Sequence, residues 1–293
     1  MNWDDVRVFL AVVRNGQLLG AARALGINHA TAARRIDALE ASLSTTLLVR
    51  RTNGTSLSAE GEKFLPFAER MESEMLGAQE AVAARDLALS GTVRIGAPDG
   101  FGVGYLAPRL GALAEKYPGL RLELVPVPRT FSLSRREADI AVTLELPREG
   151  RLKARKLVDY TLGLYATTAY LANRPAPATA EELQQHRLVG YVDDLIFSPA
   201  LDYTTEVLKG WTSDLSVSSA LGQFEAVRAG SGIGILHSFM ARRDTTLHRV
   251  LPQIVLQRAY WLVVHEDLRA LRRVAVVADY LAGIVAADRA IFS

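Results

Sequence analysis

Apolar residues recur at helical spacing through the first forty positions of the chain. Steps of three and four connect Val6, Phe9, Leu10 and Val13. This spacing predicts a helix over 3–14, and a second segment, 18–25, is rich in small residues that let another helix approach closely. Gly26 suits the left-handed backbone of a tight turn, and Asn28 is a favoured N-cap. A third helix is therefore expected from Asn28 to about Ser42, with Ile36, Leu39 and Leu43 facing the core.

The helical pattern then gives way to two short apolar strand segments. These are 47–50 and 56–57, and they flank an Asn53-Gly54 pair. Asn-Gly is the strongest short hairpin signal, because both central residues of the turn must take positive φ. We expect a small antiparallel hairpin, a wing, directly after the three helices.

A long helix with a heptad seam follows, and Ser58 is its expected N-cap. The seam comprises Phe64, Ala68, Met71, Met75, Ala78, Val82, Arg85 and Leu89. Because nearly all of these residues are apolar or small, the seam predicts pairing with another helix, most simply its copy in a second subunit. A helix over 59–89 would form a rod of roughly 45 Å.

Strand and helix patterns alternate from residue 91 onward. Strands are expected at 92–98, 120–127, 138–143, 161–166, 232–236 and 260–264, and helices at 99–117, 179–186, 219–229 and 267–287. Such alternation indicates an α/β fold with largely parallel sheets. Ligands in these folds gather at the carboxyl ends of the strands.

The composition of the chain limits its expected domain number, location and chemistry. The chain has 293 residues, 49% of them hydrophobic, so it can bury a sizeable core in two or three domains. It has no apolar run of membrane-spanning length, and an acidic start where a secretory signal would be basic. We therefore expect a cytoplasmic protein that does not enter a membrane. The absence of cysteine excludes thiol chemistry and Cys zinc sites.

The distribution of charge says more than the net charge of +2. Residues 23–54 carry a local charge of +3, and four of their arginines form two pairs, Arg34-Arg35 and Arg50-Arg51. In a helix-turn-helix unit, residues near the start of the second helix reach base edges, and nearby arginines hold phosphate or guanine. The candidate DNA-binding residues are Asn28, His29, Thr31, Arg34, Arg35, Arg50 and Arg51. The alternative is an ordinary surface helix and a hairpin with solvated arginines.

Residues 1–90 resemble the N-terminal part of LysR-type transcriptional regulators. The matching residues, in order, are 9–12, Gly16, 21–25, 27–40, 47–51, Gly54 and 57–61. The family commonly has Ser where this chain has Gln17, Asn28 and Ala33, and Pro where it has Ala30. The resemblance implies the same docking on DNA, with a change in which bases or phosphates are read.

Residues 91–293 resemble the effector-binding domain of the same family, a two-lobed α/β fold like type 2 periplasmic binding proteins. The resemblance lies in 94–96, 117–118, 138–142, 170–171 and 229–235. It implies a winged helix-turn-helix over 1–58, a linker helix for dimerisation over 59–90, and an effector-binding domain over 91–293. The first lobe would comprise about 91–159 and 265–293, and the second about 160–264.

Candidate effector-binding residues lie just past the expected strand ends. They are Asp99, Gly100, Phe101, Thr130, Phe131, Thr143, Ser218, Ser219 and His237. Ser218 and Ser219 are equally well explained as caps of the next helix, and Phe131 as core. Family members that bind carboxylates often have Ser or Thr where Asp99 stands. Since an anionic side chain repels a carboxylate, we expect that the effector is not held by an acid group at this point.

Other signals for enzymes and cofactors are weak. The glycines at 100–104 and 230–234 lack the G-x-G-x-x-G spacing, no phosphate-binding loop or G-x-S-x-G motif occurs, and the five histidines lack metal-ligand spacing. We expect no enzymatic activity, no cofactor and no metal. The predicted function is a homodimeric or homotetrameric regulator that binds double-stranded operator DNA and responds to an unidentified small-molecule effector, with RNA polymerase as a further candidate partner. The alternatives are a two-lobed solute-binding protein or enzyme, and an architectural DNA-binding protein.

Overall fold

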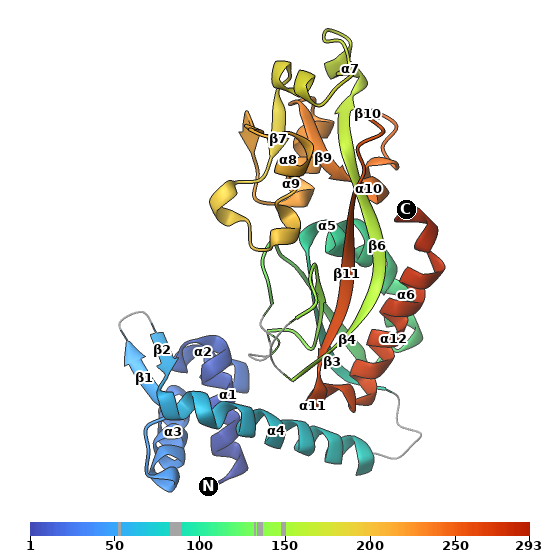
Figure 1. Ribbon diagram of the computed structural model, residues 1–293. Coiled ribbons are helices and arrows are strands. Elements are labelled where there is room, and N and C mark those ends of the chain that lie inside the picture. Colours follow the sequence, from blue (N-terminus) through green and yellow to red (C-terminus); the bar gives the residue numbers. More distant parts are fainter. Residues whose placement is uncertain (52–53, 83–88, 132, 134–136, 148–150) are drawn as a thin grey trace. The chain divides into compact units, whose positions relative to one another are not determined.

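The computed structural model describes residues 1–51, 54–82, 89–131, 133, 137–147 and 151–293. The chain divides into two compact units (Figure 1), one built mainly from residues before 88 and the other mainly from residues after it. Among the described residues, no helix is both long and apolar enough to cross a membrane.

Three helices form the core of the first unit: α1 (Trp3–Asn15), α2 (Leu18–Leu25) and α3 (His29–Leu43). Gly16 and Gly26 end α1 and α2 with left-handed φ values of 67° and 65°. Asn28 caps α3, because its Oδ1 accepts a hydrogen bond of 2.7 Å from the backbone N–H of Thr31. Buried side chains from the three helices, among them Phe9, Ile36 and Leu39, form one apolar cluster. The predicted helices, turn and cap are confirmed.

The wing consists of β1 (Leu48–Arg51) and β2 (Gly54–Leu57), which are antiparallel. Its register corrects the predicted turn, because Gly54 lies in β2 opposite Arg51 and is not a central turn residue. The residues between the strands, 52–53, lie outside the described part. Gly54 has φ 136°, and a Cβ there would lie 2.6 Å from the carbonyl oxygen of Gly16. This glycine therefore lets the wing approach the turn between α1 and α2, where Thr55 N–H donates to Gly16 O.

Helix α4 (Ala59–Val82) begins at Ser58, whose Oγ accepts from the N–H of Gly61 at 2.9 Å. Its 24 described residues span about 36 Å, and the expected continuation over 83–88 lies outside the described residues. Of the predicted seam, Phe64, Ala68 and Met71 pack on the three-helix core of their own chain, whereas Met75 and Ala78 are exposed. Arg85 lies outside the described residues, and Leu89 is not helical. The seam is thus shared between the core and the surface, which corrects the prediction of a single pairing stripe.

The second unit contains a sheet of nine described strands in the order β4-β3-β5-β11-β6-β9-β7-β8, with β10 also paired to β6. Their bounds are β3 (Gly91–Ala97), β4 (Leu120–Pro126), β5 (Ile140–Thr143), β6 (Leu152–Thr167), β7 (Leu188–Gly190), β8 (Leu215–Ser216), β9 (Ile233–His237), β10 (Leu247–Val250) and β11 (Leu256–His265). The strands β3, β4 and β5 are parallel to one another, as are β7, β8 and β9. The long strands β6 and β11 are antiparallel to their neighbours, so the sheet is mixed, not largely parallel as expected.

The two long strands connect the parallel sets, which are the sheets of the two lobes. One end of β11, Trp261–Val264, pairs with β5, and the register of β11 with β6 shifts between Tyr260 and Trp261. The other end of β6 pairs with β9 and β10. In β11 the change of lobe therefore falls near Tyr260, before the expected boundary at 264/265, because the strand passes through both lobes without a break.

Several helices of the second unit are shorter or more irregular than expected. In place of one helix over 99–117 the chain forms α5 (Asp99–Phe101), the π-helix Gly102–Leu106, the 3-10 turn Ala107–Arg109 and α6 (Leu110–Lys116). The expected helix over 179–186 is a 3-10 helix, Glu181–Gln185, and further 3-10 turns occur at Asp193–Leu195, Pro199–Leu201 and Arg289–Ile291. The remaining helices of this unit are α7 (Thr168–Leu171), α8 (Thr204–Val207), α9 (Ala220–Arg228), α10 (Ser238–Ala241) and α12 (Arg272–Ala287), whereas α11 (Glu266–Arg269) is grouped with the first unit.

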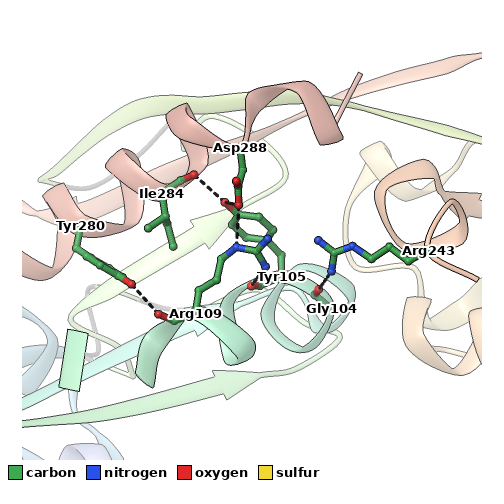
Figure 2. A network of polar contacts seen from close by, with 7 residues as sticks. All are labelled: Gly104, Tyr105, Arg109, Arg243, Tyr280, Ile284 and Asp288. Atoms are coloured by element: carbon green, nitrogen blue, oxygen red, sulfur yellow. Dashed lines mark hydrogen bonds and ion pairs between the residues drawn. The ribbon is translucent and has the colours of Figure 1, made fainter. Parts of the chain in front are cut away.

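A polar network joins the segment from α5 to α6 to the C-terminal helix α12 (Figure 2). Tyr105 donates to the carbonyl oxygen of Ile284 and to Asp288, and Arg109 Nε donates to Asp288 Oδ2 at 2.8 Å. Tyr280 donates to the carbonyl oxygen of Arg109. These bonds attach the C-terminal helix to the segment from α5 to α6.

Candidate DNA-binding surface and effector cleft

The outward face of α3 carries most of the residues predicted to read DNA. Asn28, His29 and Arg34 are exposed, and Thr31 is half-buried. The helix can present this face because Ala32, Ile36 and Leu39 anchor the opposite side in the apolar core. The departures from the family pattern, Ala30 and Ala33, lie at the start of the same helix, and Ala30 is exposed. The start of α3 therefore offers one imidazole, one guanidinium and several small side chains.

The two arginines of α3 have different surroundings. Arg35 forms ion pairs with two carboxylates at the start of α1, to Asp5 Oδ1 at 3.1 Å and to Asp4 Oδ2 at 3.4 Å. Asp5 is buried, so this contact ties α3 to α1. Arg34 is exposed, and among the described residues no ion pair is formed by it. Arg34 is thus the better placed of the two for a phosphate or a base.

The wing is held to α3 by a carboxylate. Glu40 Oε1 accepts from the backbone N–H groups of Leu47 and Leu48, at 2.6 and 3.0 Å, just where β1 begins. Arg50 and Arg51 lie further along β1, beside residues 52–53, which the structure does not describe. Glu40 thereby fixes the start of the strand that carries the second arginine pair relative to the candidate recognition helix.

An apolar groove runs along α4 in the first unit and has a volume of about 1000 Å³. Its lining comes from the start of α1, the end of α3 and one face of α4: Met1, Asn2, Trp3, Val6, Leu43, Phe64, Phe67, Arg70, Met71, Glu74, Met75 and Ala78. Phe67 and Met75 are 57% and 40% exposed, which is high for such large apolar side chains. The exposed apolar side chains make this groove a candidate interaction surface.

In the second unit, five of the predicted effector residues meet where α5 approaches α9. Asp99 Oδ2 accepts from Ser219 Oγ at 2.6 Å and from the N–H of Leu221 at 3.0 Å. Gly100, Phe101 and His237 are buried beside them. These residues form a closed junction between the lobes and line none of the described cavities. Ser219 does cap α9, since its Oγ accepts from the N–H of Gly222, and Ser218 is half-buried.

Stacked aromatic rings continue this junction into the core. Phe101 packs on Tyr260, Tyr260 on Tyr160, and Tyr160 on His237, with ring centroids 4.3, 4.1 and 5.2 Å apart. Burial raises the pKa of both tyrosines well above the ordinary value of 10. Burial also lowers the pKa of His237 from 6.5 to about 4, although the nearby Asp99 carboxylate acts in the opposite direction. His237 is therefore neutral at pH 7.

The buried neutral imidazole of His237 leads to a testable pH dependence. Its pKa in the folded chain lies below that of the unfolded chain, so the unfolded chain takes up a proton first as the pH falls. The free energy of unfolding should therefore decline between about pH 6.5 and 4, by up to about 3 kcal/mol from this group. Chemical denaturation of His237→Gln should show a shallower decline over this range. His248→Gln, which changes an exposed histidine, is the control, and equal slopes in all three proteins would contradict the assignment.

The other predicted effector residues, Thr130, Phe131 and Thr143, line a cavity of about 260 Å³. The full lining is Pro98, Arg129, Thr130, Phe131, Val142, Thr143, Leu144, Glu145, Leu146, Pro147, Phe197 and Ser198. Phe131 can lie here because Gly96 has no side chain, and a Cβ at Gly96 would meet its ring at 2.7 Å. The Arg129 guanidinium lies 5.3 Å from the centre of the same ring. The cavity thus combines an apolar wall with hydroxyls and both signs of charge.

Sequence reasoning missed Arg129, Glu145, Phe197 and Ser198 among the lining residues. Arg129 directly precedes Thr130, and Glu145 lies two residues after Thr143, so the rule that found Thr130 and Thr143 could have included them. Phe197 and Ser198 come from the second lobe, in a segment with no strand pattern of its own. A second cavity, of about 190 Å³, lies at the ends of β7 and β8 and is lined by Tyr191, Asp193, Ile196, Leu201, Thr204, Trp211, Thr212, Ser213 and Ser216. Within the described ranges, no group of three His, Cys, Asp or Glu side chains could hold a metal ion.

A winged helix-turn-helix followed by a two-lobed α/β domain defines a class of DNA-binding proteins with a separate ligand-binding module. The model of the LysR substrate binding domain matches residues 88–284, and that of the bacterial regulatory helix-turn-helix protein, lysR family, matches residues 3–62. The chain belongs to the LysR family of transcriptional regulators. It is a DNA-binding regulator of transcription with an effector-binding domain, and family members bind DNA and effectors and form oligomers.

Individual relatives agree with the family models. The chain is 28% identical to the HTH-type transcriptional regulator CrgA of Neisseria meningitidis over 291 residues, covering 96% of each protein. It is also 28% identical to PtxR of Pseudomonas aeruginosa, over 86% of this chain and 82% of that protein. Among solved structures, the Vibrio cholerae virulence activator AphB is similar with a TM-score of 0.60 and 27% identity, over 97% of this chain and 99% of that one. These relatives are transcriptional regulators, not enzymes.

Proposed function

We propose that this chain is a homo-oligomeric regulator whose α3 reads operator DNA in the major groove while the wing contacts the adjacent backbone or minor groove. The observation that carries the proposal is the exposed N-terminal face of α3, capped by Asn28 and fixed beside the wing by Glu40. Asn28, His29, Thr31 and Arg34 are the proposed readers or phosphate holders, and Arg50 and Arg51 the wing contacts. A protein with this task acts in the cytoplasm.

Arg35 has a different role in this proposal. Its guanidinium is already engaged by Asp4 and Asp5, so it positions α3 on α1 and contributes less to the charge that faces DNA. Arg35→Ala would act first on the stability of the reading head and only through it on DNA affinity.

A second copy of this chain is the proposed occupant of the groove along α4. The groove is lined mainly by apolar side chains, and a symmetric pair of such surfaces is self-complementary. Two copies would present two reading heads to one duplex, which suits an operator with inverted half-sites. Association of such dimers into tetramers and binding of RNA polymerase are extensions of this proposal.

The proposed effector site is the cavity of about 260 Å³ that is lined by Thr130, Phe131 and Thr143 together with Phe197 and Ser198 of the second lobe. Pockets for drug-sized ligands usually measure about 300 to 1000 Å³, so this one suits a small metabolite. Residues from both lobes line it, so a ligand there would bind one arrangement of the lobes more tightly than another. Effector binding at Asp99 itself is not part of the proposal, because that carboxylate is buried and hydrogen-bonded.

Footprints on the DNA upstream of the gene, with and without pooled small metabolites, test the effector proposal. A footprint that changes with the pool supports it, and Thr130→Trp, which places a large side chain at the cavity, should remove the change. Thr205→Trp, at an exposed position of α8 that does not line the cavity, is the matched control. A footprint that stays the same with every metabolite pool would instead favour an architectural DNA-binding protein.

A further inference from the structure

The start of α9 in the second lobe is occupied by a carboxylate of the first lobe. Asp99 is the first residue of α5, two residues after the end of β3, and its Oδ2 accepts hydrogen bonds from the Ser219 hydroxyl and the Leu221 backbone N–H. The side chain is 8% exposed, so these bonds lie away from water, where charge-assisted hydrogen bonds are strong. A helix start with free N–H groups is a ready site for an anion, and here the protein supplies the anion itself.

We propose that Asp99 is an internal ligand that latches the two lobes together and determines that the cleft does not take an anionic effector at the start of α9. The proposal adds a specific contact to the function proposed above for the effector-binding domain. Only the regulatory role of this contact rests on that proposed function. The latch itself is a property of the second unit and does not depend on DNA.

Neighbouring residues support the contact between Asp99 and the start of α9. Ser219 donates its hydroxyl to Asp99 while its oxygen accepts from the N–H of Gly222, so one side chain completes both the latch and the cap of α9. Gly100 permits the close approach, because a Cβ there would lie only 3.2 Å from the Cβ of Ala220. The lobes therefore pack closely at Gly100, and Asp99 lines neither of the two described cavities of this unit.

The latch is also attached firmly to the first lobe. The helical segment that begins at Asp99 is bound to α12 through Tyr105 and Arg109 (Figure 2), so Asp99 cannot shift without that segment. Arg243 of the second lobe adds one further contact, a hydrogen bond of 3.4 Å to the carbonyl oxygen of Gly104. Without the Asp99 carboxylate, this bond, the hydrogen bond from Arg242 to the backbone oxygen of Ser293 and the packing of Phe101 on Tyr260 would remain between the lobes.

Removal of the carboxylate should create an anion site that the wild type lacks. In Asp99→Ala the donors of Ser219 and Leu221 lose their partner, and formate has the size and charge of the missing group. In thermal unfolding of the full-length protein we expect the Tm of Asp99→Ala to fall by about 5 to 10 °C. Formate at about 0.1 M should then recover about 2 to 4 °C relative to sodium chloride of equal ionic strength. The wild type should respond equally to both salts.

Asp244→Ala provides the matched control. Asp244 Oδ1 also accepts from one backbone N–H and one hydroxyl, but both belong to Thr246 in the same lobe. This variant should show no difference between formate and chloride. Asp99→Asn keeps the side-chain volume and one acceptor oxygen, so it should fold with an intermediate Tm and show no formate response. It replaces Asp99→Ala as the test variant if Asp99→Ala does not fold.

Two results would overturn the latch: a Tm of Asp99→Asn equal to that of the wild type, or equal effects of formate and chloride on folded Asp99→Ala. Operator binding measured on the same wild-type preparation separates this proposal from the proposed function. A wild type that fails to bind DNA contradicts the function and leaves the formate result as it stands.

Discussion

Arg34→Ala is expected to weaken operator binding by about 10- to 100-fold, the usual cost of losing one good contact to a base or phosphate. Arg34 lies exposed on α3, and the side of the helix opposite the exposed face is fixed in the core by Ile36 and Leu39. The substitution leaves that packing intact, so folding should be unchanged. Fluorescence anisotropy with operator DNA at several salt concentrations measures both affinity and the number of phosphate contacts.

The control variants distinguish the loss of a specific DNA contact of Arg34 from the loss of one positive charge anywhere on the protein. Arg121→Ala removes the same charge from a side chain that is 79% exposed on β4 of the other unit, and it should leave affinity nearly unchanged. Arg50→Ala should weaken binding through the wing and lower the salt slope. If Arg34→Ala and Arg50→Ala both kept the affinity and the salt slope of the wild type, the assigned DNA-binding surface would be wrong.

Met75→Asp should convert the protein largely to monomers. Met75 is 40% exposed in the groove along α4, and a carboxylate at this position would have to be removed from water against the mainly apolar lining of a second groove. We expect the dimer dissociation constant to rise by at least about 100-fold, since a buried unpaired charge costs several kcal/mol. Sedimentation velocity over a range of concentrations measures this constant directly.

Loss of the dimer should also reduce binding to an operator with two half-sites, because one head then binds alone. Leu195→Asp is the matched control, since Leu195 is 53% exposed but lies in a 3-10 turn away from this groove's lining. A Met75→Asp protein with the mass of the wild-type oligomer at every concentration would exclude the α4 groove as the interface.

Features set within a few residues of one another were predictable from the sequence. Gly26, Asn28 and Ser58 end or begin their helices as predicted, because a cap depends on a backbone angle or on one side chain that bonds a backbone N–H three residues away. The apolar faces of α1 and α3 were predictable for the same reason, since a helix repeats its own period.

Features that depend on residues far apart in the sequence were not predictable from it. Gly54 looked like half of an Asn-Gly turn, but it is needed where the wing meets the carbonyl of Gly16, which only the folded chain shows. The ion pairs of Arg35 with Asp4 and Asp5 could not be predicted either, because only folding brings α1 beside α3. The pattern of short strands likewise could not show that the expected strand 161–166 is the end of a longer continuous strand, β6.

The candidate effector residues were chosen because ligands in α/β folds gather at the carboxyl ends of strands. This rule led to Thr130, Phe131 and Thr143, which line the cavity, and to Asp99 and His237, which lie in the closed junction. Both groups follow strand ends, so the rule cannot separate them. The difference depends on Ser219 and the start of α9, which lie about 120 residues further along the chain.

Selection of binding sequences from a random DNA pool by the full-length protein tests the central claim most directly. The account predicts an enriched inverted repeat, with half-sites about one helical turn or a multiple of it apart, and no enrichment by a protein that carries Arg34→Ala and Arg50→Ala together. A pool that shows no enriched motif, or the same motif with the double variant, would contradict the account.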